Sequence, residues 1–454
     1  MLQSLALLIA TIIVLHGLFG PQDAPRNLAT VLTWVHYRGL LVVALLAAGN
    51  FFCTGCPFVL VRDVARRGHQ PTLHWPRFLR NKWFALVLFA GVLFGYELFD
   101  LWGLPRATAW VVIGYFAAAL AIDLFFRGAT FCKYLCPIGQ FNFAASTLSP
   151  LEVRVREPEV CATCRTVDCI RGRRDKHAPE VTIQRGCELS LFLPRKVGNL
   201  DCTFCLDCVQ ACPHDNVAIA GRLPGAELID GRRRSGIGRL AARPDIAALA
   251  ALFAFGALLN AFAMVSPVYA AEQWLARVMG LSSEAPVLGV VFLVALLIVP
   301  LLMLTAAASV SRLLSRSHGA SIPDGMVRYA VALIPLGFGM WIAHYAFHLL
   351  TGVLTVVPVT QSAAVDLLGW AALGDPWWGW TGARPGAIFP LQIGFVLLGT
   401  VGSIAVAHGI SEREYPARPF AATAPWAVVV LMVAAAALWV LSNPMEMRGV
   451  GFLG

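Results

Sequence analysis

CTFCLDCVQACP, residues 202–213, is the stretch that decides what this sequence folds around. Its cysteines follow the spacing C-x2-C-x2-C-x3-C-P, the ligand run of a bacterial [4Fe–4S] cluster. Three close thiolates on a tight loop can hold three corners of one cubane, and the fourth, Cys212, begins a helix and reaches a second cluster. A structural zinc knuckle is the alternative, but zinc sites generally use two CxxC pairs.

A second cysteine motif must exist if Cys212 is to be used. CATCRTVDC, residues 161–169, supplies three cysteines, and Cys187 follows in GCEL. We therefore predict two [4Fe–4S] clusters with crossed ligands. One takes Cys161, Cys164, Cys169 and Cys212, and the other takes Cys202, Cys205, Cys208 and Cys187.

The composition places the rest of the chain in a lipid bilayer. Only 13% of the 454 residues are charged and the mean hydropathy is +0.70, whereas a soluble domain carries about a quarter charged residues. The net charge of +9 resides largely in short loops between apolar runs, which indicates the cytoplasmic side of a membrane protein and argues against nucleic-acid binding.

Nine apolar runs are long enough to span a bilayer. They cover residues 2–19, 32–52, 83–102, 108–129, 245–268, 286–308, 327–350, 389–409 and 423–442. The first lacks a basic start and an Ala-x-Ala site, so we expect a retained span rather than a cleaved signal. In the second, His36 and Arg38 either face protein or precede a span that starts after them.

The loops orient these spans. The basic loops at 60–82 and 150–243, and those after the sixth and eighth runs, fall on one side, which we assign to the cytoplasm. Trp377, Trp378 and Trp380 fall on the other side, as an interfacial belt. The N-terminus is then inside and the C-terminus outside, in an inner (cytoplasmic) membrane.

The predicted fold is an α-helical integral membrane protein with an inserted cytoplasmic α+β domain for two clusters. Residues 1–149 form a four-span bundle, 150–243 the ferredoxin-like insert, and 244–454 a five-span bundle.

Four further cysteines lie at span ends on the predicted cytoplasmic side. Cys53 and Cys56 lie in FFCTGCPF, and Cys132 and Cys136 lie in FCKYLCPIG. A proline follows each pair and disfavours helix at the residue before it. The four thiols could form a third cluster or metal site, act as a redox dithiol, or be inert buried thiols.

The combined pattern resembles the membrane-bound polyferredoxins of the NapH and NosR type and the related CcoG and RdxA type. The shared features are two Cys-x(n)-Cys-Pro motifs at span ends, then a two-cluster insert. PRKVGNLDCTFCLDCVQACPHDNVAI, from Pro194, carries most of the likeness, which covers residues 30–220. The resemblance implies quinol-linked electron transfer or service to a respiratory metalloenzyme or cytochrome.

Weaker signals lie in the spans. His344 and His348 are four residues apart on one helix face. They could bind copper, or one of them could be an axial haem ligand. His16, Met445 and Met447, on the outer side, could join a copper site. Glu97, Asp100 and Asp123 could accept protons from quinol. The alternative in each case is a structural side chain.

Three functions fit these signals. The first is electron transfer between quinol, or an outer donor, and the cytoplasmic clusters. The second is a maturation factor that uses electrons from a ferredoxin to reduce or deliver copper for a respiratory enzyme. The third is a redox-sensing transporter, but no pair of Gly/Pro-broken spans marks two inverted halves. Composition and spacing favour the first.

Overall fold

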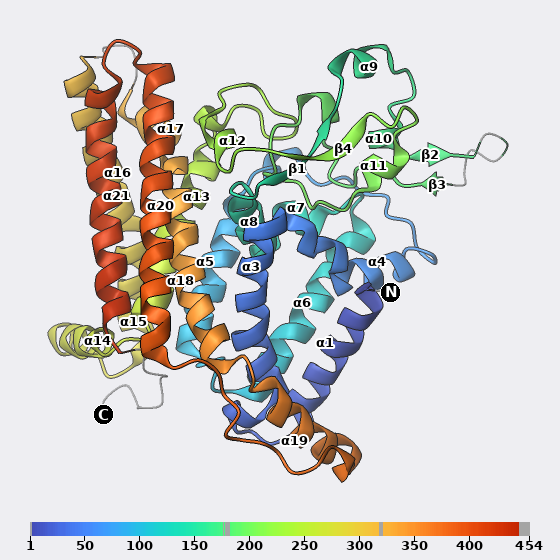
Figure 1. Cartoon of the computed structure of the whole chain (residues 1–454), viewed down its shortest axis with the longest axis vertical. Helices are drawn as coiled ribbons and strands as arrows, with labels where there is room; N and C mark the ends of the chain where they lie inside the picture. Colours follow the sequence, from blue (N-terminus) through green and yellow to red (C-terminus); the bar gives the residue numbers. More distant parts are fainter. Residues whose placement is uncertain (1, 176, 178–181, 317–320, 445–454) are drawn as a thin grey trace.

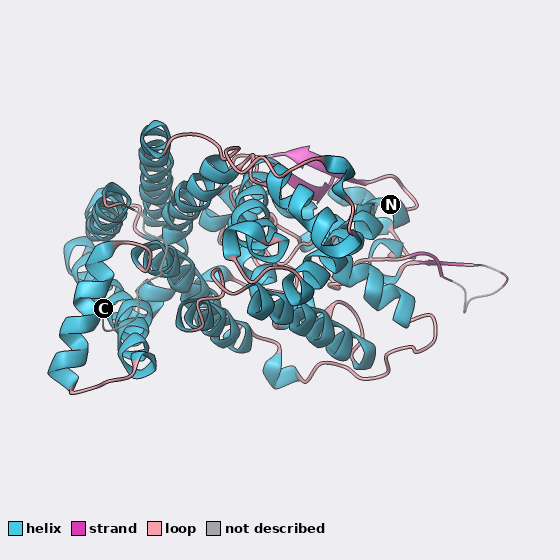
Figure 2. Ribbon diagram, turned by 90° about the horizontal axis from the view of Figure 1, so that it is seen from below, coloured by secondary structure: helices cyan, strands magenta, loops and turns pink. Residues whose placement is uncertain are grey.

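The computed structural model describes residues 2–175, 177, 182–316 and 321–444. Helices dominate it, and most of the long ones run along a common direction (Figure 1). A small region of short helices and strands, the mixed region, lies at one end of this bundle (Figure 1). Seen along the bundle, the helices form two groups that meet side by side (Figure 2). The predicted class, a multi-pass helical membrane protein, is confirmed by eight helices that are long and apolar enough to cross a bilayer.

The first group is built from the N-terminal part of the chain. Its elements are α1 (Leu2–Phe19), η1 (Ala24–Arg26), α2 (Leu28–Thr30), η2 (Val31–Tyr37), α3 (Arg38–Ala48), η3 (Gly49–Gly55), α4 (Pro57–Ala65), η4 (Arg77–Leu79), α5 (Trp83–Leu98), α6 (Pro105–Phe125), α7 (Thr130–Tyr134) and α8 (Pro137–Ser146).

The mixed region follows. Its elements are β1 (Leu151–Val155), α9 (Pro158–Thr163), α10 (Asp168–Arg171), β2 (Arg173–Arg174), β3 (Thr182–Gln184), η5 (Leu193–Arg195), α11 (Asp207–Ala211), β4 (Val217–Gly221), α12 (Ala226–Ile229) and η6 (Leu240–Ala242). β1 pairs antiparallel with β4, so that Leu151 faces Gly221, and β2 pairs antiparallel with β3.

The second group completes the chain. Its elements are α13 (Pro244–Phe262), α14 (Ser266–Met279), α15 (Glu284–Leu293), η7 (Val294–Ile298), α16 (Val299–Ser315), α17 (Ile322–Tyr329), η8 (Ala330–Leu333), α18 (Ile334–Gly352), α19 (Val356–Leu368), η9 (Ala371–Leu373), α20 (Pro385–Glu414) and α21 (Pro419–Ser442).

Proline sets many of these helix starts. It is the first residue of α4, α6, α8, α13, α20 and α21. Its missing N–H would have no intrahelical partner at that position, and its fixed φ already suits a helix. The prolines after Cys56 and Cys136 therefore begin α4 and α8, so each cysteine pair lies directly before a helix.

The core lies where α13 and α18 meet, because both helices bury most of their side chains. Phe253 of α13 and Phe338 and Trp341 of α18 are almost fully buried, and the Trp341 indole N–H donates to the Phe253 carbonyl at 2.8 Å. The outer helices instead expose leucine and valine, for example Leu398 and Val401 of α20. Apolar surface of this kind on long helices is what a lipid-facing helix presents.

The helices match eight of the nine predicted spans. The remaining run, 83–102, forms α5, a shorter apolar helix of 16 residues, so the count of nine stays a prediction. The helical segment of the second run begins at Leu28, before His36 and Arg38, and contains a π-helical stretch at Val31–Tyr37. Where its membrane-crossing part starts stays a prediction.

Several helices lie outside the predicted spans. Among them, the amphipathic α14 and the short α19 follow α13 and α18 at the end of the bundle opposite the mixed region (Figure 1). Both lie in segments too polar or too short for a span. The orientation that we derived from the basic loops stays a prediction.

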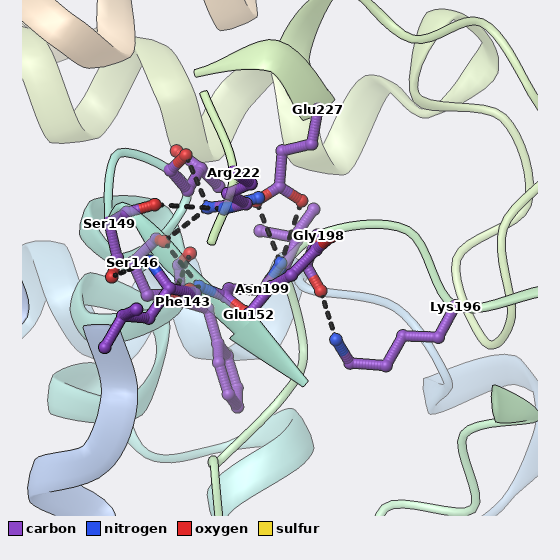
Figure 3. A network of polar contacts seen from close by, with 12 residues as sticks. Phe143, Ser146, Ser149, Glu152, Lys196, Gly198, Asn199, Arg222 and Glu227 are labelled. Atoms are coloured by element: carbon purple, nitrogen blue, oxygen red, sulfur yellow. Dashed lines mark hydrogen bonds and ion pairs between the residues drawn. The ribbon is translucent and has the colours of Figure 1, made fainter. Parts of the chain in front are cut away.

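A buried polar network joins the mixed region to the membrane helices (Figure 3). The Glu227 carboxylate pairs with Arg222 at 2.7 Å and accepts the backbone N–H of Asn199 at 2.9 Å. Arg222 and the Asn199 side chain both donate to the carbonyl of Ser146, the last residue of α8, at 2.9 and 3.1 Å. One carboxylate thus fixes the segment before Cys202 against α8.

Replacing Glu227 by Ala leaves Arg222 and Arg234 buried without their shared carboxylate. We expect E227A to destabilise the mixed region by about 3–5 kcal/mol. Thermal unfolding in detergent, with the rate of proteolysis within residues 150–243, measures this effect. The exposed Glu159 supplies a control, since E159A should change stability by no more than about 0.5 kcal/mol. Equal melting of the two variants would contradict the anchoring role.

Candidate iron–sulfur site

The first group of thiols combines the segment 161–169 with the far end of the CTFCLDCVQACP run. Burial, together with thiolates at Cys212, Cys161 and Cys164, raises the pKa of the Cys169 thiol to about 11. These four sulfurs therefore lie within electrostatic range of one another. Asn216 donates its backbone N–H to Cys212 Sγ at 3.3 Å and its side-chain amide to Cys161 Sγ at 3.4 Å.

The second group combines the rest of that run with Cys187. Burial, together with thiolates at Cys202 and Cys187, raises the pKa of Cys208 to about 12. Burial also raises the pKa of Cys205, with smaller contributions from the same two thiolates. The backbone N–H of Leu191 donates to Cys187 Sγ at 3.4 Å. The structure thus brings together the second predicted set of four, and its ligand role stays a prediction.

The tight loop around this group rests on an unusual backbone. Phe204 and Leu206 both have positive φ, 57° and 66°, a region that side chains other than glycine rarely adopt. The Phe204 side chain is 2% exposed. Burial of that ring offsets the strain, which lies on the order of 1–3 kcal/mol per residue, and the alternating backbone curls the loop around the three cysteines.

The third group forms where two span ends meet. Burial raises the pKa of Cys132, and thiolates at Cys136, Cys56 and Cys53 raise it further. The backbone N–H of Gly139, in the first turn of α8, donates to Cys136 Sγ at 3.2 Å. The structure therefore brings the two Cys-Pro motifs together, although they lie in different parts of the sequence.

A cavity of about 410 Å³ is lined by cysteines of both the third and the second group. These are Cys53, Cys56 and Cys132 of the third group and Cys205 of the second. Arg62, which is 2% exposed, also lines it and pairs with Glu188 at 2.8 Å. The cavity is a polar, thiol-lined space at the junction of membrane bundle and mixed region.

One amide side chain connects the two groups directly. Cys53 Sγ donates to Asn50 Oδ1 at 2.9 Å, and Asn50 Nδ2 donates to the Cys202 carbonyl at 3.0 Å. Asn50 is fully buried. Sequence reasoning missed this residue, although a lone amide three positions before a cysteine at the end of an apolar run is a usable signal.

A buried ion pair fixes the same junction. Lys82 Nζ lies 2.5 Å from Asp201 Oδ1, directly before Cys202, and also donates to the Lys133 carbonyl, next to Cys132, at 2.8 Å. Lys82 and Asp201 are each 3% exposed. One lysine therefore holds the backbone beside a cysteine of the second group against that beside a cysteine of the third.

Within the described residues, no three His, Cys, Asp or Glu side chains lie close enough together to hold one metal ion. Which group the three sets of thiols would hold stays a prediction. Backbone N–H groups donate to Cys136, Cys187 and Cys212, and contacts of this kind tune the potential of an iron–sulfur cluster where one is bound.

A second polar cluster lies inside the membrane bundle. The Arg38 guanidinium donates to the Tyr96 hydroxyl at 3.2 Å and lies 4.8 Å from the Tyr345 ring centroid. The ring of His344 lies 5.4 Å from that of Tyr345 and 4.9 Å from that of His348. Neither nitrogen of His344 has a hydrogen-bond partner in the described part of the chain.

The copper or haem role of His344 and His348 stays a prediction. The positive charge of Arg38 interacts with both rings and disfavours a metal ion there. Buried Glu97, next to Tyr96, accepts a long hydrogen bond from Asn260 at 3.5 Å. Three residues with predicted roles, Glu97, His344 and His348, thus lie near an arginine for which no such role was predicted.

The other predicted residues have structural contacts. Asp123 lies 3.7 Å from Arg62 and accepts the backbone N–H of Phe131 at 2.9 Å, at the cysteine end of α6. His16 accepts the Leu28 N–H at 3.0 Å and lies 3.1 Å from Asp366, so it joins α1 to α19. Met445 and Met447 lie outside the described residues, and the proton-accepting role of Asp100 stays a prediction.

Comparisons with known proteins give three weak similarities. An Escherichia coli (strain K12) protein named electron transport protein YccM is 34% identical over 94 residues, which are 21% of this chain and 22% of that protein. Regulatory protein NosR of Pseudomonas aeruginosa is 25% identical over 222 residues, 44% of this chain and 28% of that protein. The chain thus spans less than a third of the length of either.

An uncharacterised protein of Methanocaldococcus jannaschii, MJ0749, is 23% identical over 202 residues, 41% of this chain and 69% of that protein. No protein-family profile and no solved structure matches the chain. The similarities support a relationship to NosR-like membrane electron-transfer proteins and no closer assignment.

Serine substitutions test the first and the second group of thiols separately. We expect C205S and C161S each to remove the EPR signal of a different reduced cluster, because the two cysteines lie in different groups. Iron analysis of the anaerobically purified variants should show a loss of about one cluster each. An EPR spectrum unchanged from the wild type in either variant would contradict the assignment of that group.

Proposed function

We propose that this protein is a membrane electron carrier that connects the quinone pool to two [4Fe–4S] clusters in the mixed region, which we place in the cytoplasm. A bound [4Fe–4S] cluster accepts and releases single electrons at a potential set by burial, nearby charge and hydrogen bonds to sulfur. The chain supplies eight thiols for the two clusters and four more at the membrane junction.

The contiguity of the three thiol groups carries this proposal. The third group contacts the second through Asn50, which accepts a hydrogen bond from Cys53 and donates one to the Cys202 carbonyl. The second group contacts the first, since Cys208 and Cys169 belong to one buried cluster and interact electrostatically. The three thiol groups therefore form a continuous series from the membrane bundle to the outer face of the mixed region.

The membrane end of this path meets the polar cluster around Arg38. Tyr37 precedes Arg38, and its ring lies 5.5 Å from that of Phe52, which precedes Cys53. A partly buried arginine, a buried carboxylate and two histidines are costly inside a bilayer and are typical of a functional site. Both nitrogens of His344 and Nε2 of His348 lack a hydrogen-bond partner in the described part of the chain. Glu97 and the histidines can accept the protons that quinol releases when it gives up electrons.

The names of the relatives agree with electron transport, and one of them adds regulation. The maturation alternative requires a copper site at His344 and His348, and the Arg38 cation beside them disfavours that metal. We therefore retain electron transfer between quinol and the thiol-held clusters as the function that the geometry supports best.

Substituting both membrane motifs tests this path. In C53S/C132S we expect the iron content to fall by about one cluster relative to the wild type. The EPR signals of the clusters proposed for the first and second thiol groups should be retained. Reduction of those clusters by dithionite should persist, because their own eight cysteines are intact. Iron content equal to that of the wild type would contradict a cluster at the junction.

The matched control for this experiment is T54S/T130S. Thr54 directly follows Cys53, and Thr130 lies two residues before Cys132. Both threonines donate hydroxyl hydrogen bonds to nearby carbonyls, and serine keeps that donor. We expect wild-type iron content and melting temperature in the control, so a loss in C53S/C132S reports the thiols themselves.

A further inference from the structure

One cavity has no cysteine in its lining and plays no part in the proposed electron path. Its volume is about 670 Å³. It opens between the segment after α12 and the ends of α17 and α20, on the side of the bundle that carries the mixed region (Figure 1). Four arginines and two carboxylates line it, namely Arg232, Arg239, Arg328, Arg413, Asp230 and Glu414.

The arginines of this cavity are only partly neutralised. Glu414 pairs with Arg328 at 2.6 Å and with Arg413 at 3.1 Å, and Asp230 pairs with Arg232 at 2.6 Å. Arg239 is exposed and has no carboxylate partner in the described part of the chain. The buried Nε of Arg328 also lacks a hydrogen-bond partner there. The cavity carries two positive charges in excess and a donor without an acceptor.

The cavity also lies where a lipid headgroup would lie. Arg413 is near the last residue of the membrane helix α20, and its guanidinium donates to the Ile229 carbonyl after crossing to the mixed region. Ile229 and Ala241 are apolar residues in the lining of the cavity. Phe420, 78% exposed, opens the next membrane helix in the same α20–α21 hairpin and offers apolar surface to acyl chains.

From this arrangement we propose that the cavity binds the phosphate of an anionic phospholipid headgroup, which bridges the mixed region to the ends of α17 and α20. Arginine-lined pockets at the ends of membrane helices recognise such headgroups, and guanidinium forks suit phosphate oxygens. The lipid would complement the two excess charges. This site is independent of the electron path, and its test does not depend on iron.

Native mass spectrometry of the delipidated protein tests the site. Phosphatidylglycerol and phosphatidylcholine are added separately to the wild type, to R232Q/R239Q and to R233Q. Arg233 is an exposed neighbour on the same loop that does not line the cavity, so R233Q is the matched control.

We expect the wild type and R233Q to bind phosphatidylglycerol in preference to phosphatidylcholine. R232Q/R239Q should bind phosphatidylglycerol about tenfold or more weakly, because two charges near the headgroup are lost, while its melting temperature without lipid stays unchanged. Equal phosphatidylglycerol affinity in the double variant and the wild type would overturn the proposal. Displacement of the lipid by inorganic phosphate at equal concentration would also overturn it, since the site would then serve a soluble anion.

Discussion

The structure depends most on hydrogen bonds to buried polar groups. The irregular segments that carry the cysteines are buried against the end of an apolar helix bundle, and their donors and acceptors need partners there. An unpaired buried donor or acceptor there costs on the order of 1–3 kcal/mol. Asn50, Lys82 and Glu227 meet this need, and all three are buried. Asn50 and Glu227 bond backbone of the mixed region, and Lys82 bonds the Asp201 carboxylate there. These contacts also set which cysteines come together.

The same constraint explains how structure leads to function. Asn199 to Cys202 is fixed from both sides, by Glu227 and Ser146 on one and by Asn50 and Lys82 on the other. These hydrogen bonds restrain the position of Cys202 relative to Cys53. In the electron path that we propose, such a restraint would limit variation of the transfer rate, because the rate depends on the separation of the two sites.

The sequence alone predicted the helical membrane class and eight of the spans, because twenty apolar residues leave few other structures available. It also predicted two sets of four cysteines from spacing, and the fold places each set together. It could not predict the Asn50 bridge, since the contact joins residues 152 positions apart. Nor could it show that Arg38 lies among Tyr96, Tyr345 and His344, because a charge in an apolar run does not reveal which helices surround it.

The most direct measurement of the central claim is anaerobic. The oxidised protein in detergent is mixed with a reduced quinol, and cluster absorbance and EPR are followed in time. We predict prompt reduction, faster in the wild type than in an Asn50→Leu variant that retains its iron. The account would be contradicted if quinol left the clusters oxidised while a low-potential ferredoxin reduced them, because electrons would then enter from the cytoplasmic side.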